Sequence, residues 1–402
     1  MNKAQEKYQQ LKKNTTALSH LSAPQAQGQT KWCPPRITGK ACSRGISFPD
    51  GTPASARKKE NMSALAQPSE LPPPAAMLQM IQSFWVSRAL HVAAELGVPD
   101  LLKDGPRNSE ELANATGTHA PSLYRVLRAL GSVGVFAEDD EERFTLTPLG
   151  NTLCTDAPGS LRHFAIEVLG QNHYNAWDRV MYSVKTGATA FNHVYGVSKW
   201  QFHAEHTEEA RIFDEAMASF NTVVAGAVVG SYDFSSSEKL VDVGGGDGSF
   251  LAAILEANPR LRGVLLDQRH VTDSAQRRFK RLGMAERCEV VAGDFFSSVP
   301  NGDTYILKWI VHDWDDPFSA AILKNCCFAM SDGGRVLIVE SVLQPGGTTS
   351  FGKFMDLNML VMTGGRERTE AEYRALLGCA GLKLTSIMPT PTEISVIEAV
   401  RE

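Results

Sequence analysis

The chain has 402 residues, of which 43% are hydrophobic and 21% are charged, and its formal net charge at pH 7 is −5. This length and composition are typical of two or three globular domains, and the negative charge gives no reason to expect nucleic acid as a partner. No apolar run approaches the roughly 20 residues of a membrane-spanning helix, so no membrane partner is expected. The seven cysteines form no CxxC pair, which argues against a disulfide framework or a metal site and favours a reducing, cytoplasmic compartment.

The first 61 residues differ from the rest of the chain. They hold 11 Lys and Arg against 3 Asp and Glu, a net charge of +8, whereas the remainder carries −13. The segment has no apolar period, so we expect disorder, and residues 1–75 are assigned to this extension and its proline-rich linker. Two interpretations stay open: an organelle transit peptide, or non-native, upstream-translated sequence before a natural start at Met62. We favour the second.

Residues 76–155 are predicted to form a winged-helix domain. A helix with apolar residues at helical spacing begins near Met77. A second helix is expected to start at the N-cap Ser109, without a capping box, and a third near Ala120. The segment 135–147 has a charged turn between two short strand-like runs and is typical of a hairpin. Helix, turn, helix and hairpin in this order are the winged-helix pattern.

Such a domain can bind DNA or hold two subunits together. Only Arg125 and Arg128 provide cations on the helix that would enter DNA, whereas residues 138–142 of the wing are all acidic. Acidic side chains facing phosphate would be repelled. We therefore expect a homodimerisation domain and no nucleic-acid partner, with a ligand-sensing winged-helix transcription regulator as the alternative.

The remainder divides into a helical region, 156–235, and an α/β domain, 236–402. The helical region ends in a long helix near 208–234 with apolar residues on more than one face, so it should be sandwiched between domains. After it, short apolar strands alternate with helices: KLVDV, GVLLD, CEVVAG, TYILKWI and RVLIVES, then two strands in the tail. The pattern predicts a Rossmann-like, doubly wound sheet of seven strands, the last antiparallel.

The glycine-rich segment DVGGGDGSF follows the first of these strands and opens a helix. Gly244 and Gly246 let the backbone turn tightly and approach a ligand. Ser249 stands where a dinucleotide fingerprint needs its third glycine, so the loop suits a ligand without a pyrophosphate. Asp267 ends the second strand, where a carboxylate can accept hydrogen bonds from both hydroxyls of an adenosine ribose. Asp294 ends the third strand and can accept from the adenine amino group.

Six segments resemble, in order, the motifs of small-molecule S-adenosylmethionine-dependent O-methyltransferases: LVDVGGGDG, LDQRHV, GDFF, LKWIVHDWDD, VLIVES and GGRERTEAEY. This group includes the plant caffeic acid enzymes and bacterial natural-product tailoring enzymes. The resemblance covers roughly residues 77–400, and the winged helix fits the dimerisation domain of that family. It implies S-adenosylmethionine as the cofactor, with contacts from Gly244, Asp267, Asp294, Phe295 and Lys308, and with Trp314 packing near the adenine.

The chemistry is then expected at the stretch LKWIVHDWDD. A phenol has a pKa near 10, so at neutral pH it needs a base, and such a group typically contributes about 10²- to 10⁴-fold. His312 emerges from the fourth strand and is the predicted base. The family places carboxylates at Glu340 and Glu367, where they would fix the imidazole tautomer and favour its protonated form. Asp313 follows His312 directly and could belong to the same site, but a simpler interpretation is that it caps the helix that starts near Asp316.

The acceptor pocket is expected between the long helix and the segment FMDLNMLVMTGG. Its candidate wall residues, which can also be inter-domain core, are Phe213, Met217, Phe220, Met359 and Met362. Thr363 stands where plant enzymes of the family carry Asn-Pro, so the chain looks more like the bacterial members. The resemblance implies a homodimer that methylates a hydroxyl of an aromatic or polyketide-like secondary metabolite. The alternatives are N- or C-methylation, or a same-fold decarboxylase or hydroxylase that has lost methyl transfer.

Overall fold

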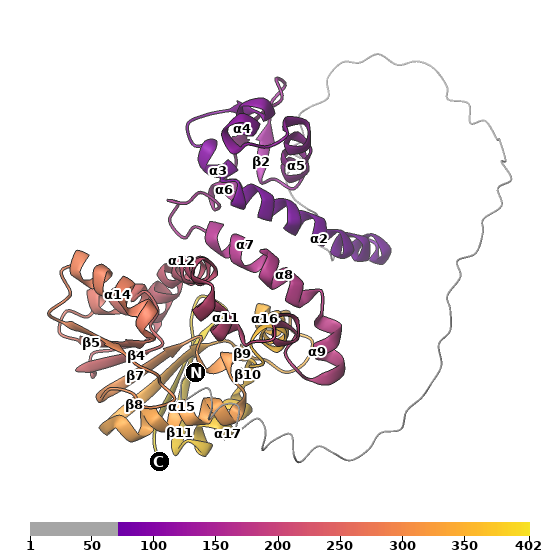
Figure 1. Ribbon diagram of the computed structural model, residues 1–402. Coiled ribbons are helices and arrows are strands. Elements are labelled where there is room, and N and C mark those ends of the chain that lie inside the picture. The colour runs from indigo at the N-terminus through magenta and orange to yellow at the C-terminus, as the bar shows by residue number, and fades with distance from the viewer. Residues whose placement is uncertain (1–70) are drawn as a thin grey trace, which may run out of the picture. The chain divides into compact units, whose positions relative to one another are not determined.

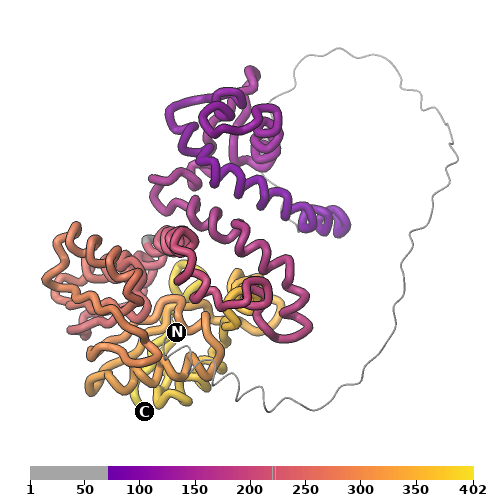
Figure 2. Tube along the Cα trace, viewed as in Figure 1, coloured from indigo at the N-terminus to yellow at the C-terminus, as the bar shows by residue number. Residues whose placement is uncertain are grey.

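The computed structural model describes residues 71–402, apart from the side chains of Phe220 and Thr222. The predictions for the basic segment before Met62 lie outside the described residues, and so does the pocket prediction for the Phe220 side chain. Figures 1 and 2 follow the described chain from a mainly helical N-terminal domain, through a series of short helices, to a domain built on a large sheet.

The N-terminal domain is a winged helix, as predicted. Its core joins the helices to the wing through buried leucine and phenylalanine side chains, among them Leu112, Leu127 and Phe144. The wing has a third short strand that the sequence pattern did not indicate, and the strands pair in the order β1-β3-β2. The elements are α2 (Pro73–Glu95), α3 (Val98–Leu101), β1 (Arg107–Asn108), α4 (Ser109–Thr116), α5 (Ala120–Ser132), β2 (Phe136–Glu138), β3 (Arg143–Leu146) and α6 (Pro148–Asn151).

The start of α4 corrects one prediction. The N-cap is Asn108 and not Ser109, because the Asn108 side chain accepts a hydrogen bond from the Glu111 N–H at 2.9 Å. The Glu111 carboxylate accepts from the Asn108 N–H at 2.9 Å in return. This reciprocal pair is a capping box, and it was missed because moving the cap by one residue brings an acidic residue to the third helical position.

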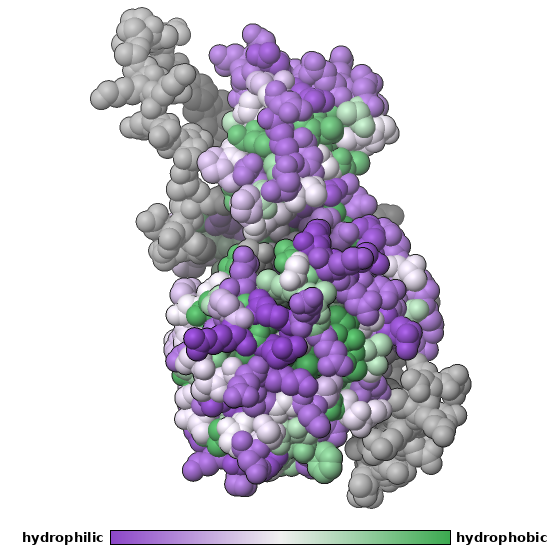
Figure 3. Space-filling model, turned by 90° about the vertical axis from the view of Figure 1, so that its left-hand side faces the viewer, coloured by the Kyte–Doolittle hydropathy of each residue, from purple (hydrophilic) through white to green (hydrophobic). Residues whose placement is uncertain are grey.

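The connecting region consists of α7 (Arg162–Val168), α8 (Gln171–Trp177), α9 (Val180–Thr186), α10 (Ala190–Tyr195), α11 (Lys199–Glu205) and α12 (Thr207–Ser231). Helix α12 packs against α7 of the same connecting region and against α13 (Ser249–Ala257) of the C-terminal domain. Within residues 71–402 no single helix is long and apolar enough to span a membrane; the two halves of α12 would be so only as one bent pair. The face drawn in Figure 3 is largely hydrophilic, with hydrophobic residues gathered in patches.

The C-terminal domain contains the predicted seven-stranded sheet, in the order β11-β12-β8-β7-β4-β5-β6. Only β12 runs antiparallel, to both β8 and β11, so the predicted antiparallel last strand is confirmed. Its elements besides α13 are β4 (Lys239–Val243), β5 (Arg262–Asp267), α14 (Arg269–Arg281), β6 (Cys288–Ala292), β7 (Gly302–Lys308), the 3₁₀ turn η2 (Val311–Asp313), α15 (Asp316–Ala329), β8 (Met330–Glu340), β9 (Val342–Leu343), α16 (Phe351–Met362), β10 (Arg368–Thr369), α17 (Glu370–Cys379), β11 (Leu382–Pro389) and β12 (Ser395–Arg401).

Both faces of this sheet are covered, which explains its continuously apolar strands. Successive side chains of a strand point to opposite faces. Val241 and Tyr305 pack with α15 and α17, whereas Leu240 and Ile306 pack with α12, α13 and α14. Each fully buried side chain of this size stabilises the fold by about 1.5–3 kcal/mol. The strands are thereby held rigidly, and their carboxyl ends can position a site.

Candidate active site

The sheet has its topological switch point between β4 and β7, which pair although β5 and β6 come between them in the chain. Open α/β sheets bind ligands outside the carboxyl ends of their strands at such a point. The chain leaves β4 through the glycine loop, residues 244–248, and leaves β7 through the turn that carries His312. The glycine loop and the His312 turn therefore emerge from adjacent strands.

The glycine loop is held against the end of β5. Gly244 has a φ of 75°, its N–H donates to the Leu266 carbonyl at 2.8 Å, and a Cβ at this position would clash with the Ile310 side chain. Gly246 has a φ of 59° and its N–H donates to the Asp267 carboxylate at 2.8 Å. A Cβ at Gly246 would meet open space. The backbone here is therefore accessible to a ligand, as a cradle for a nucleoside cofactor requires.

The residues predicted for the adenosine side lie at the ends of β5 and β6. Burial raises the pKa of Asp267, and the N–H groups of Gln268 and Gly246 oppose the shift. The Asp294 carboxylate accepts from the Phe296 N–H at 2.9 Å and so shapes the turn after β6. The Trp314 ring lies edge-on to Phe296 with 4.7 Å between centroids, and 6.3 Å from Phe295. The structure therefore brings the predicted Phe295 and Trp314 into one aromatic cluster.

Lys308, at the end of β7, faces an acidic residue that the sequence pattern marked only as the first position of the glycine motif. Burial lowers the pKa of Lys308 to about 8, and the charge of Asp242 opposes that shift. Burial likewise raises the pKa of Asp242 to about 7. The Lys308 ammonium also lies 4.1 Å from the centroid of the Trp309 ring. Trp309 has a φ of 55°, so the chain leaves β7 through a strained residue that redirects it toward His312.

His312 is buried and is reached by two carboxylates from separate segments. Its Nδ1 lies 2.6 Å from Oε1 of Glu367, which follows α16. Its main-chain N–H donates to Oε1 of Glu340, at the end of β8, at 3.0 Å, and the Tyr373 hydroxyl donates to Oε2 of Glu340 at 2.7 Å. Glu367 therefore orients the ring, whereas Glu340 holds the main chain of the turn.

The electrostatics of this cluster favour a charged imidazole. Burial opposes the imidazolium, but the charges of Glu367, Asp313 and Glu340 outweigh it and raise the pKa of His312 to about 9. Because an ionised Glu367 can only accept a hydrogen bond, Nδ1 carries the proton in the neutral ring and Nε2 keeps its lone pair. Nε2 is then the atom that can exchange a proton with a ligand.

The acidic residues after His312 lie in different surroundings, and Asp313 does not have its predicted role as a helix cap. The cap of α15 is Asp315, whose carboxylate accepts from the Phe318 N–H at 3.2 Å, so Asp313 does not cap this helix. Asp313 is buried with its carboxylate 3.9 Å from Nε2 of His312, and burial raises its pKa to about 6. Asp316 is paired with the buried Arg368 at 2.9 Å. Of these three acidic residues, only Asp313 is buried.

The predicted pocket walls fall into two groups. Phe213 on α12 is half-buried beside the Trp200 and His203 rings, with centroids 5.8 and 5.0 Å away, and Met217 is half-buried one turn later. Met362 is 1% exposed and belongs to a core cluster with α10 residues, and Met359 is 6% exposed. The structure brings Phe213 near the His312 turn, because Trp200 stacks on Trp314 at 6.3 Å. It places Met362 within the core.

Comparison with known protein families gives two matches. Residues 177–383 match the O-methyltransferase domain, and residues 78–156 match the O-methyltransferase dimerisation domain. The chain belongs to the O-methyltransferase family. The resemblance inferred from the motifs is confirmed, and so is the assignment of the winged helix as a dimerisation domain.

Three relatives illustrate the range of this methyltransferase family. The phenazine O-methyltransferase of Lysobacter antibioticus is 46% identical over 324 residues, covering 80% of this chain and 95% of that protein. The 8-amino-8-demethylriboflavin N,N-dimethyltransferase of Streptomyces davaonensis is 36% identical over 340 residues, covering 83% and 97%. A crystal structure of an O-methyltransferase from neocarzinostatin biosynthesis, in complex with S-adenosylmethionine and 2-hydroxy-5-methyl naphthoic acid, superposes with a TM-score of 0.70 at 34% identity, covering 79% and 96%. The likeness is thus to bacterial biosynthetic enzymes, as Thr363 indicated.

Two polar residues on α12 of the methyltransferase face the glycine loop and were not predicted. Burial raises the pKa of Asp214 to about 7, and the charges of Asp267 and Asp247 add to the shift. The Asn221 side chain donates to the Ser249 hydroxyl at 2.7 Å. Neither residue has a motif of its own, because only the packing of α12 on α13 brings them to the loop. Among residues 71–402, no cluster of three or more His, Cys, Asp or Glu is arranged to hold a metal ion.

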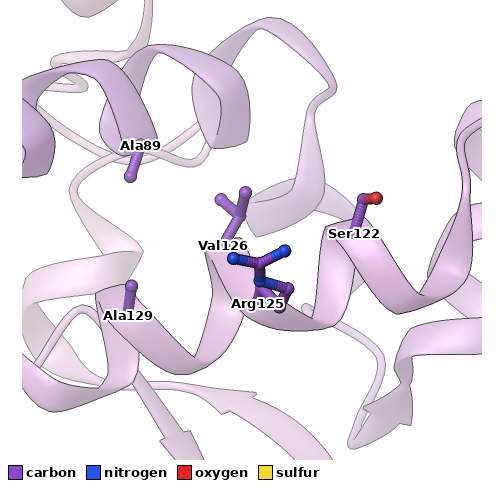
Figure 4. Close-up of a pocket in the computed structure, with 5 residues that line it drawn as sticks. All are labelled: Ala89, Ser122, Arg125, Val126 and Ala129. Atoms are coloured by element: carbon purple, nitrogen blue, oxygen red, sulfur yellow. The ribbon is translucent and has the colours of Figure 1, made fainter.

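A cavity of about 350 Å³ in the dimerisation domain lies apart from this site. It opens between α2 and α5 and is lined by Ala89, Ser122, Arg125, Val126 and Ala129 (Figure 4). None of its lining residues belongs to the glycine loop or to the His312 cluster. One of the two cations considered for DNA binding, Arg125, therefore lines a mainly apolar pocket.

Gly365→Ala is expected to destabilise the methyltransferase by about 1–3 kcal/mol. A Cβ at Gly365 would overlap the carbonyl oxygen of His312, and backbone atoms in a packed turn cannot move aside. Gly378→Ala in α17 is the matched control: its Cβ would meet open space, so helix propensity should stabilise the fold by roughly 0.5–1 kcal/mol. Urea denaturation measures both variants, and equal effects would contradict the tight contact at Gly365.

Proposed function

We propose that this methyltransferase transfers a methyl group from S-adenosylmethionine to a hydroxyl of a small aromatic or polyketide-like secondary metabolite. The observation that carries the proposal is the His312 ring, held at Nδ1 by Glu367 at 2.6 Å. Its Nε2 remains available at the edge of the sheet where the glycine loop also emerges. A base and a nucleoside cradle on adjacent strands are the arrangement that methyl transfer to a hydroxyl needs.

The glycine loop and the strand-end acids fit the cofactor. Gly244 and Gly246 would hold its methionine and ribose portions, Asp267 would accept from the ribose hydroxyls, and Asp294, Phe295 and Trp314 would flank the adenine. Lys308 would lie below the loop. When bound, S-adenosylmethionine supplies an activated methyl group on a sulfonium. Holding the acceptor oxygen in line with that methyl makes the step effectively unimolecular, which lowers the barrier by several kcal/mol.

His312 would take the hydroxyl proton at Nε2 as the acceptor oxygen attacks. An imidazole of pKa about 9 is close to a phenol of pKa near 10, so the proton moves to His312 at a cost of about 1.4 kcal/mol. Glu367 stabilises the resulting imidazolium through Nδ1. Glu340 and Tyr373 keep the turn in place. Asp313 adds negative charge on the Nε2 side, which also favours the cation.

The test is methyl incorporation from labelled S-adenosylmethionine into matched acceptors. A phenol, its methyl ether and the corresponding aniline on the same ring form one set, and a quinone set with the same substituents forms another. Label in the phenol or hydroxyquinone alone supports O-methylation. Label in the aniline alone supports N-methylation, the alternative suggested by the riboflavin-type relative. No label with any acceptor, together with intact cofactor binding, would favour a decarboxylase or hydroxylase.

We further propose that the enzyme is a homodimer joined through α2. Three apolar side chains at helical spacing on this helix are largely exposed: Met77 at 58%, Ile81 at 64% and Trp85 at 65%. A row of this kind on one helix face marks an interaction surface.

The five cysteines in residues 71–402 are free thiols, which supports a reducing cytoplasm as the location.

The variant Ile81→Glu/Trp85→Glu is expected to convert the dimer to a monomer, because two charges would be buried in the interface. Light scattering after size exclusion measures the mass. Phe328→Glu is the control, since Phe328 is 92% exposed but lies on α15. A monomeric wild type, or dissociation by the control as well, would contradict an interface on α2.

A further inference from the structure

Arg368 is a fully buried cation whose function no motif explains. Its side chain is 0% exposed, and it is the largest of the fully buried side chains in residues 71–402. It follows Glu367 directly and lies in β10, which pairs with β9 just beyond the end of β8. A buried charge is costly unless its hydrogen bonds are all made, and apolar residues of similar size fill such space more favourably. Filling space is therefore a poor explanation for an arginine here.

The guanidinium of Arg368 donates to acceptors on both sides of His312. Nη1 donates to the Val311 carbonyl at 3.2 Å, and Nη2 donates to the Trp314 carbonyl at 2.9 Å. These two residues bracket the His312–Asp313 pair. Nη1 also donates to the Arg366 carbonyl and Nη2 to the Ser319 hydroxyl, each at 3.2 Å. Arginine presents five N–H donors in a rigid fork, and here that fork spans the turn.

The same guanidinium is anchored at the start of α15. Nε and Nη2 both donate to Oδ1 of Asp316, at 3.0 and 2.9 Å. The His312 turn, the first turn of α15 and the segment of Glu367 are therefore joined by one side chain. The hydrogen bond between Glu367 and Nδ1 of His312 is 2.6 Å long, and a shift of about 1 Å in either segment would break it.

We infer that Arg368 is a positioning residue, which sets the distance between His312 and Glu367 by clamping the turn 311–316 to β10. The inference rests on the proposed function, because it assigns Arg368 to the alignment of the proposed base. Arg368 donates only to main-chain carbonyls, Asp316 and Ser319, and it has no hydrogen bond to the imidazole or to Glu367. Its effect on His312 is therefore geometric.

The test compares Arg368→Lys with Arg374→Lys, a matched change at an exposed arginine of α17. Lysine keeps the charge but cannot span the turn with a rigid fork. We expect Arg368→Lys to lower kcat by about 100-fold, the cost of a misplacement of about 1 Å, with an unchanged KM for S-adenosylmethionine. The control should retain the wild-type kcat. A wild-type kcat in Arg368→Lys would overturn the inference.

A second readout does not depend on methyl transfer. Nitrogen-edited NMR of the imidazole follows the Nδ1 proton and the titration of His312 in the free enzyme. In Arg368→Lys the Nδ1 proton signal should move upfield and the titration should shift to lower pH, because the contact with Glu367 is loosened. An unchanged signal and titration would overturn the inference even if kcat fell. If His312→Ala were fully active but the NMR shift occurred, the proposed function would fail while the clamp would stand.

Should Arg368→Lys not fold, Asp316→Asn carries the test. The Asp316 side chain is 49% exposed, so the substitution is tolerated on steric grounds, yet it removes the charge that anchors the guanidinium. We expect the same upfield movement and the same direction of titration shift, smaller in size. A His312 titration identical to that of the wild type in Asp316→Asn would overturn the inference.

Discussion

His312→Ala is expected to lower kcat for methyl transfer by more than about 100-fold, within the range that a positioned general base contributes. Without the imidazole, no proton acceptor is held beside the hydroxyl. The carboxylates of Glu367 and Asp313 do not occupy the position of Nε2 and cannot replace it. The proposed cofactor contacts come from the glycine loop and from the ends of β5 and β6, so the Kd for S-adenosylmethionine should stay near the wild-type value. Single-turnover assays measure the first quantity, and calorimetry measures the second.

His119→Ala provides a matched control, since His119 is an exposed histidine of the dimerisation domain. It should retain wild-type turnover. A thermal melt of His312→Ala is needed as well, because removing the buried imidazole leaves carboxylates without their cation. Folded His312→Ala with wild-type turnover would remove His312 as the base.

The second large effect is on pH dependence. The base must be neutral to accept a proton, so activity is lost as pH falls below its pKa and gained as pH rises. The pKa of His312 is raised to about 9, and a group with this pKa is neutral only about 1% of the time at pH 7. We expect kcat/KM to rise about tenfold per pH unit from about pH 6 and to level off near 9. A bound sulfonium would lower the pKa of His312, since a like charge disfavours the imidazolium. The acid limb of the kcat profile, which reports the cofactor-bound enzyme, should therefore lie at lower pH than the acid limb of the kcat/KM profile.

Glu367→Gln tests the origin of this shift. Glu367 is the largest of the charges that raise the pKa of His312, so its neutralisation should move the acid limb of kcat/KM to lower pH. The plateau should fall at the same time by about 100-fold or more, because an amide no longer enforces one tautomer of the imidazole. Glu370→Gln, an exposed acidic residue three positions away, is the control. An unmoved limb in Glu367→Gln would mean that another group is responsible for the titration.

Periodic and local features of the chain were predictable from the sequence. The apolar runs of β4, β5, β7 and β8 identify buried parallel strands, because both faces of the sheet are covered. The glycine loop, Asp267 and His312 lie at or shortly after the ends of such strands, so the rule that parallel strands end at one edge brings them together. Even here the limit of local patterns is visible at Asn108, where two adjacent polar residues fit the cap and only the hydrogen bonds distinguish them.

Contacts between distant segments were decided by the tertiary structure. The motifs predict that Glu340 and Glu367 accompany His312. They do not predict that Glu340 binds the main-chain N–H of His312 whereas Glu367 contacts the ring. Arg368 lies inside the motif GGRERTEAEY, and Asp214 lies in no motif, but the sequence assigns neither residue a function because their partners lie on other elements. Met362 fits a pocket wall by composition, and packing places it in the core. The alternation of side chains in a strand relates residues two positions apart, so it can be recognised in the sequence. The atom that a side chain contacts depends on how separate elements pack in three dimensions.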